Sequence, residues 1–182
     1  MHFWLVYRGE LKSNGSKEHK HDIRKKFHSQ IKGLWRHGPL SILRLDESDS
    51  ITGSMIKKVG PFTFATLVIS KADFYVELDV TMLRPGTPGQ IIYQGGDIDN
   101  KLKTLFDALR YPRKQDEIPD GESPDKNFNP FFCLLEDDSL ISRINVLSDR
   151  LLDSNDPKEV LLLIHVTIKA KRSTLFSSAL GL

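Results

Sequence analysis

Two segments of the chain alternate strictly between apolar and polar residues, and this alternation constrains the fold more than any other feature. Residues 74–82 read Phe-Tyr-Val-Glu-Leu-Asp-Val-Thr-Met, and residues 160–169 place an aliphatic residue at every second position. Because successive side chains of a β-strand point to opposite faces of a sheet, both segments predict strands that are buried on one face. The fold must therefore contain a sheet that covers a core.

Residues 17–36 have a different period, which is typical of an amphipathic helix. Its apolar stripe consists of Ile23, Phe27, Ile31, Leu34 and Trp35. The turn at residues 13–16, Ser-Asn-Gly-Ser, can cap this helix, and a second helix is predicted at 100–110. Further strands are predicted at 2–8, 62–69 and 140–147, whereas 46–60 is expected to be a surface loop and the tail from Lys171 to be frayed. These elements do not alternate regularly, so we expect an α+β fold, a two-layer sandwich of a small mixed sheet with two main helices.

The length of 182 residues fits a single domain, 1–182, with a polar insertion at about 111–131. Cys133 is the only cysteine, so no disulfide can form within the chain. No apolar run approaches the length of a bilayer-spanning helix, and the first residues do not resemble a signal peptide. We therefore expect a cytoplasmic protein without a membrane partner.

Charge is distributed unevenly along the chain, although the formal net charge is only +2. Residues 1–44 contain ten Lys or Arg and three acidic residues, whereas residues 97–138 contain eleven acidic residues and six basic ones. A basic segment beside an acidic centre suits a protein that attracts a polyanion and holds a cation. The basic side chains expected off the apolar stripe, and so available to DNA, are Arg24, Lys25, Lys32 and Arg36. The alternative is an ordinary solvated helix face.

The acidic segment begins with Asp97, Asp99, Asn100 and Lys103, and Asp137-Asp138 follows further along. Carboxylates so close in sequence repel one another unless a cation neutralises them. Mg²⁺ takes oxygen ligands, usually one or two carboxylates together with substrate phosphates. The positive charge of a nearby lysine can bind a phosphate. Lys103 could instead form an ion pair with Asp107, one turn along the helix. These residues predict a metal-dependent phosphoryl-transfer site.

The order Asp-x-Asp-Asn-x-x-Lys, then Asp107-Ala108-Leu109, then Asp-Asp-Ser-x-Ile resembles the RusA family of Holliday junction resolvases. The resemblance covers residues 96–141 and is interrupted by the insertion. It implies a small α+β homodimer that nicks a four-way DNA junction using Mg²⁺, for which Mn²⁺ can substitute. By the same resemblance, Asp97, Asp99 and Asp138 bind the metal, Lys103 is required for cleavage, and Asn100 and Asp137 support the site.

Three features depart from the family pattern. Gly96 stands where a basic residue is usual, the loop before the acidic pair is longer, and the chain has an added basic helix near its start. Two other interpretations remain open: a phosphatase of the haloacid-dehalogenase type, and a DNA-binding relative without catalytic activity. The segment before Asp97 fits poorly with the hydrophobic strand that the phosphatase interpretation requires.

Overall fold

The computed structural model describes residues 1–37, 39–86 and 98–182. The helices are α1 (Lys17–Arg36), α2 (Ile98–Leu109) and α3 (Leu175–Ala179). The strands are β1 (His2–Glu10), β2 (Ile56–Val59), β3 (Phe62–Val68), β4 (Phe74–Arg84), β5 (Phe131–Leu135), β6 (Ile141–Arg150) and β7 (Glu159–Ala170). Short 3₁₀ turns connect several of them.

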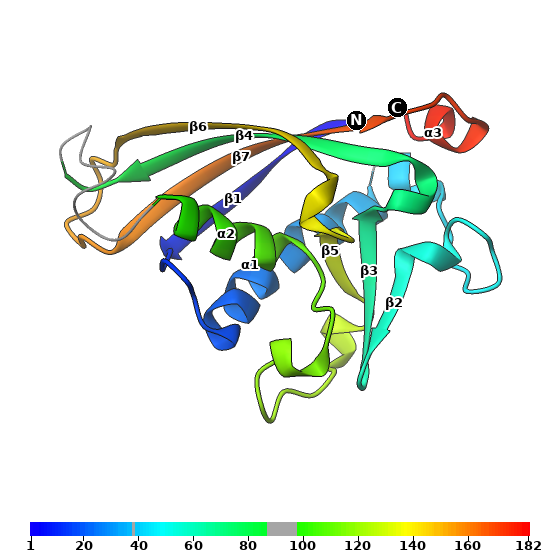
Figure 1. Cartoon of the computed structure of the whole chain (residues 1–182), viewed down its shortest axis with the longest axis horizontal. Helices are drawn as coiled ribbons and strands as arrows, with labels where there is room; N and C mark the ends of the chain where they lie inside the picture. Colours follow the sequence, from blue (N-terminus) through cyan, green and yellow to red (C-terminus); the bar gives the residue numbers. More distant parts are fainter. Residues whose placement is uncertain (38, 87–97) are drawn as a thin grey trace.

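The strands of the described residues form two sheets (Figure 1). The four-stranded sheet has the order β1-β7-β4-β6, and the three-stranded sheet has the order β2-β3-β5. β4 and β6 are parallel, as are β3 and β5, and the other pairs are antiparallel. In Figure 1, α1 and α2 lie on one side of the larger sheet, next to the smaller one. The predicted α+β class is confirmed, but with two sheets where one was expected.

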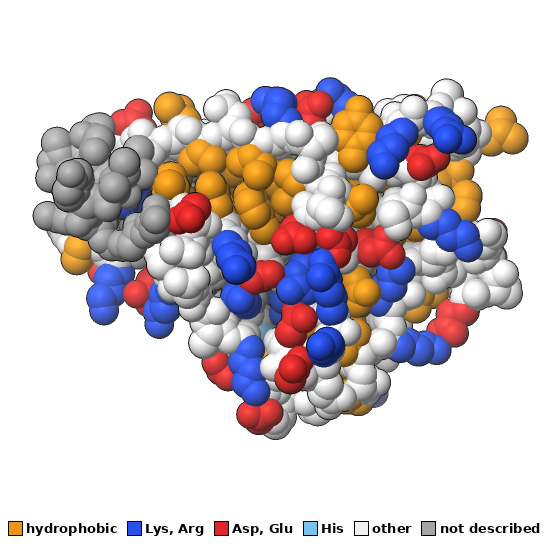
Figure 2. Space-filling view, in the orientation of Figure 1, with side chains coloured by type: hydrophobic (Ala, Val, Ile, Leu, Met, Phe, Trp, Pro, Cys, Tyr) orange, Lys and Arg blue, Asp and Glu red, His pale blue; other side chains and the backbone are white. Residues whose placement is uncertain are grey.

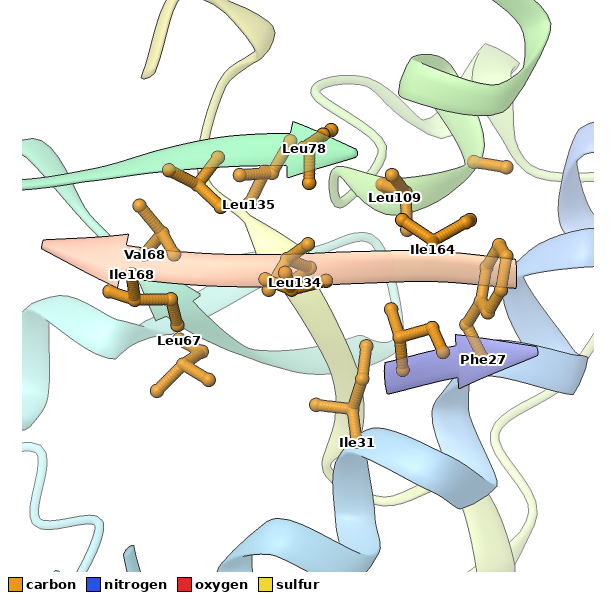
Figure 3. Close-up of a cluster of buried hydrophobic side chains, with 14 of the residues drawn as sticks. Phe27, Ile31, Leu67, Val68, Leu78, Leu109, Leu134, Leu135, Ile164 and Ile168 are labelled. Carbon is orange, nitrogen blue, oxygen red and sulfur yellow. The ribbon is translucent and has the colours of Figure 1, made fainter. Parts of the chain in front are cut away.

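The predicted apolar pattern forms the core. Every second residue of β4 and β7 is buried, as the strict alternation predicted. Phe27 and Ile31 of α1 point toward the sheet in Figure 3, and both are 1% exposed. The hydroxyl oxygen of Ser16 accepts a hydrogen bond from the His19 N–H and caps α1. The start, the end and the buried face of α1 are thus confirmed.

Two elements differ from expectation. β2 lies inside the segment predicted as a loop, because its four residues, Ile-Lys-Lys-Val, form a strand only by pairing with β3. The tail expected to fray contains α3 instead. Thr174 and Ser177 exchange backbone and side-chain hydrogen bonds at its start, and Phe176 stacks on Phe74 with ring centroids 5.8 Å apart. Within the described ranges, no helix has the length and hydrophobicity needed to cross a membrane.

Two histidines of α1 are held neutral by the core. His28 Nδ1 accepts a hydrogen bond from the Phe132 N–H, so Nε2 donates to the Asn127 carbonyl. Burial lowers the pKa of His28 to about 4; the hydrogen bond to Asn127 opposes this effect, and the charge of Lys32 adds to it. Burial, followed by the charges of Arg24 and Lys25, likewise lowers the pKa of His21 to about 4.

We therefore expect the free energy of unfolding to fall as the pH drops below about 6.5. The unfolded chain binds protons at these histidines near pH 6.5, whereas the folded chain binds them only near pH 4, so the stabilisation is complete above pH 6.5. At pH 5 the loss should be about 1 kcal/mol per histidine once solvent screening is considered. Urea titrations at pH 7 and pH 5 should show a smaller pH effect in the His21→Gln/His28→Gln variant than in wild type. An equal effect in both proteins would contradict this assignment.

Candidate metal and nucleic-acid site

The turn before α1 holds the start of α2 in place. The Gly15 N–H donates to Thr104 Oγ1 over 2.9 Å, and the Asn14 N–H donates to the Asn100 carbonyl over 3.4 Å. A Cβ added at Gly15 would lie only 2.8 Å from side-chain atoms of His19 and Thr104. Glycine is therefore required for this close approach, which fixes the first turn of α2 against the body of the protein.

Three of the predicted site residues lie in the first two turns of α2, and two of them have exposed side chains. Asp99 and Lys103 are exposed, and their spacing of four residues places them on the same side of α2. Within the described residues, no ion pair involves either side chain; Asp99 Oδ1 accepts only from the Asn100 N–H, over 2.7 Å. Asp97, the first predicted metal ligand, lies outside the described residues. The carboxylate of Asp99 is thus available to a cation, and the ammonium of Lys103 to an anion.

Lys103 does not form the ion pair that its spacing allowed. Asp107 instead pairs with Lys20 of α1 over 2.7 Å and with Arg110 over 3.0 Å. Burial alone would raise the pKa of Asp107, but these two cationic partners lower it overall. Asp107 therefore joins α1 to α2, and it leaves Lys103 without a structural partner among the described residues.

Asn100 is the third residue of α2, so it is not the cap of this helix. Its carbonyl accepts from Asn14 N–H and from the hydroxyl of Thr104. Of the two lysines near the start of α2, Lys103 is exposed, whereas Lys101 is only 7% exposed and burial lowers the pKa of its side chain.

The second acidic group directly follows the buried strand β5, the apolar run Phe131–Leu135. Asp137 accepts from the Ser139 N–H and forms an ion pair with Arg113. Asp138 lies 3.5 Å from the same guanidinium and its side chain is 49% exposed. Arg113 belongs to the polar insertion, and sequence reasoning gave no indication of this contact. Glu136, just before the pair, bonds with Lys57 and Ser70 and ties the small sheet together.

The acidic pair follows a strand that ends beside the far end of α2 from Asp99. The Tyr111 N–H donates to the Leu135 carbonyl, which places the end of β5 beside the end of α2. Asp99 is at the other end of this helix, about 16 Å away along its axis at about 1.5 Å per residue. In the described part of the chain, no three Asp, Glu, His or Cys side chains are grouped as metal ligands. At the start of α2, the exposed site residues that the structure describes are Asp99 and Lys103.

Comparisons with known proteins add no assignment to this geometry. No protein-family model, curated protein or solved structure matched the chain. The resemblance to the RusA family therefore rests on the residues of the chain itself.

The prediction that four basic side chains of α1 lie nearer solvent is wrong for Arg24. Arg24 is 2% exposed, so it does not lie nearer solvent with Lys25, Lys32 and Arg36. Its Nε donates to the Arg110 carbonyl over 3.1 Å, and Nη2 donates to the Asp107 carbonyl over 2.8 Å. The last turn of a helix leaves carbonyl groups unpaired and carries partial negative charge. Arg24 is buried because it supplies donors to the end of α2.

The other three basic side chains line one shallow cavity beside His28, Asn127 and Phe128. Lys25 forms an ion pair with Glu122, and Lys32 donates to the Asn127 carbonyl over 2.8 Å. Arg36 is exposed at the end of α1. The polar insertion therefore packs along this face and leaves part of its positive charge accessible.

If this face contacts DNA phosphates, the double variant Lys32→Ala/Arg36→Ala should bind a DNA junction more weakly and with a smaller dependence on salt. Each lost phosphate contact should reduce the slope of log affinity against log salt concentration by about 0.9. The reduction should be similar for different DNA sequences, because phosphate contacts carry no sequence information. Fluorescence anisotropy at several salt concentrations measures the slope. The exposed pair Lys158→Ala/Lys171→Ala is the control, and equal slopes in both variants would leave α1 as a solvated face.

Proposed function

We propose that this protein is a Mg²⁺-dependent endodeoxyribonuclease of the RusA type, which nicks branched DNA such as a four-way junction and acts as a homodimer. The observation that carries the proposal is the pair Asp99 and Lys103, exposed in the first two turns of α2 without an ion-pair partner among the described residues. The same helix start belongs to the sequence pattern that resembles RusA resolvases. The carboxylate of Asp99 can bind a metal ion, and the ammonium of Lys103 beside it can bind a phosphate.

The residues that would hold Mg²⁺ are Asp97, Asp99 and Asp138, whose carboxylate oxygens are the ligands that this ion prefers. When bound, the metal supplies activation of a water molecule and stabilisation of the leaving oxygen. Lys103 would offset the charge that develops on the phosphate oxygens during hydrolysis. The partial positive charge at the start of α2 favours an anion at the same place.

Asn100 and Asp137 would act by positioning these groups. The carbonyl of Asn100 connects α2 to the turn before α1, and Asp137 orders the short 3₁₀ turn that presents Asp138. Both contacts hold backbone rather than substrate. We therefore assign both residues to positioning.

Cleavage of a synthetic four-way junction, compared with a linear duplex of the same sequence, tests this function. We expect nicks in the junction with Mg²⁺ or Mn²⁺, and none when EDTA removes the metal. A chromogenic phosphomonoester, tested in parallel, should not be hydrolysed. Hydrolysis of the monoester would support the phosphatase alternative, and binding of the junction without cleavage would support a non-catalytic DNA-binding protein.

A further inference from the structure

A second cavity, of about 480 Å³, opens between α1 and the segment that follows α2. We call it the basic cavity; its lining residues are Lys17, Lys20, Arg24, Arg110, Arg113, Lys114, Asp116 and Glu117. Figure 2 shows Lys and Arg side chains gathered with acidic ones over this part of the molecule. Six of the eight lining residues are basic, so the cavity has an excess of positive charge.

Ion pairs neutralise part of this charge. Lys17 pairs with Asp120 over 2.9 Å, and Arg110 pairs with Glu117 over 2.9 Å. Lys20 pairs with Asp107, and Arg113 pairs with Asp137. Across the described residues, Arg24 and Lys114 are the two lining bases with no carboxylate within ion-pair distance.

Arg24 has donors left over after its structural contacts. A guanidinium carries five N–H groups. Three are accounted for by the carbonyls of Arg110 and Asp107 and by His21 Nδ1, which is 3.3 Å from Nη1. Two N–H groups on a nearly fully buried cation therefore have no protein acceptor among the described residues. A buried charge with no carboxylate within ion-pair distance is costly, and an anion in the cavity would offset that cost.

We propose that the basic cavity is a binding site for a phosphate group. The planar donors of arginine match the oxygens of a phosphate, and Lys114 adds a mobile point charge at the rim. The phosphate can belong to a nucleic-acid backbone or to a small phosphate compound. The proposal is independent of DNA cleavage, because it rests on residues outside the first turn of α2.

Titration of the full chain with inorganic phosphate, followed by NMR, tests this site. We expect saturable shifts at the Arg24 Nε–H and at the backbone N–H groups of residues 113–117, larger than those caused by chloride at equal ionic strength. Lys114→Gln should weaken phosphate binding about fivefold or more, because it removes a charge-assisted hydrogen bond. Lys126→Gln, an exposed lysine that does not line the basic cavity, should leave binding unchanged.

A second titration identifies the source of the phosphate. If a single-stranded oligonucleotide displaces inorganic phosphate from the same residues, the site takes a nucleic-acid backbone; if phosphate binds and is not displaced, the site takes a small phosphate compound. Either result supports the site. Shifts no larger than those with chloride, or equal affinity in Lys114→Gln and wild type, would overturn it. Because these readouts need no cleavage, they fail or succeed separately from the nuclease proposal.

Discussion

Asp99→Asn is expected to abolish Mg²⁺-dependent cleavage of a four-way junction while the protein stays folded. Asparagine keeps the shape of the side chain but removes the charge that would hold the metal. Asp99 is exposed and forms no ion pair within the described chain, so the free energy of unfolding should change by less than about 0.5 kcal/mol. Single-turnover cleavage at saturating junction measures the rate, and Asp97→Asn and Asp138→Asn should give the same loss.

The control for this series is Asp156→Asn, which changes an exposed acidic residue in the turn before β7. It should cleave at the wild-type rate. A near-native rate in Asp97→Asn, Asp99→Asn or Asp138→Asn would remove that residue from the metal site. The junction should still bind to all of these variants, because its main contacts are expected to come from basic side chains.

Asp99 lies near the start of α2, whereas the acidic pair with Asp138 follows a strand that ends beside the end of α2. A mixing experiment tests whether the two aspartates act within one chain or in two copies of it. If the site combines Asp99 of one copy with Asp138 of a second copy, a mixed dimer of Asp99→Asn and Asp138→Asn contains one site with both aspartates intact. Mixing the two inactive variants should then restore part of the activity. If both aspartates act within one chain, the mixture should remain inactive.

Arg24→Ala should lower the free energy of unfolding by about 3 kcal/mol. The substitution leaves a cavity and removes the donors that pair with the carbonyls of Asp107 and Arg110. Part of this loss is offset, because burial of the Arg24 charge is itself costly and lowers the pKa of its guanidinium. Urea unfolding at pH 7 measures the change.

Arg36→Ala is the matched control for Arg24→Ala, because Arg36 is an exposed arginine in the last turn of the same helix. Its effect should be below about 0.5 kcal/mol. Equal effects of the two substitutions would contradict the burial of Arg24 against the end of α2.

Local sequence patterns predicted α1 and the alternating strands β4 and β7, because these elements bury one face in a regular period. β2 was missed because its pattern is short and its partner β3 supplies the hydrogen bonds. Arg24 was misplaced for a related reason. Its helical position alone put it among the basic residues beside the stripe, whereas its burial depends on α2, which follows much later in the chain.

The same limit applies to the candidate site. The sequence placed Lys103 on a helix but began that helix at residue 100, whereas α2 begins at Ile98, so Asp99 is helical and shares a side with Lys103. The distance between Asp99 and Asp138 depends instead on how the end of β5 meets the end of α2, which no local pattern encodes. The contact of Arg113 with the acidic pair arises in the polar insertion and has the same cause.

The most direct test of the central claim is the position of a bound metal. Crystals soaked in Mn²⁺ should show anomalous density at the start of α2, with carboxylate oxygens of Asp99 and Asp97 among its ligands, and Asp99→Asn should lose that density. Density only at other places, in crystals soaked at a concentration that supports cleavage in solution, would contradict a metal site at this end of the helix.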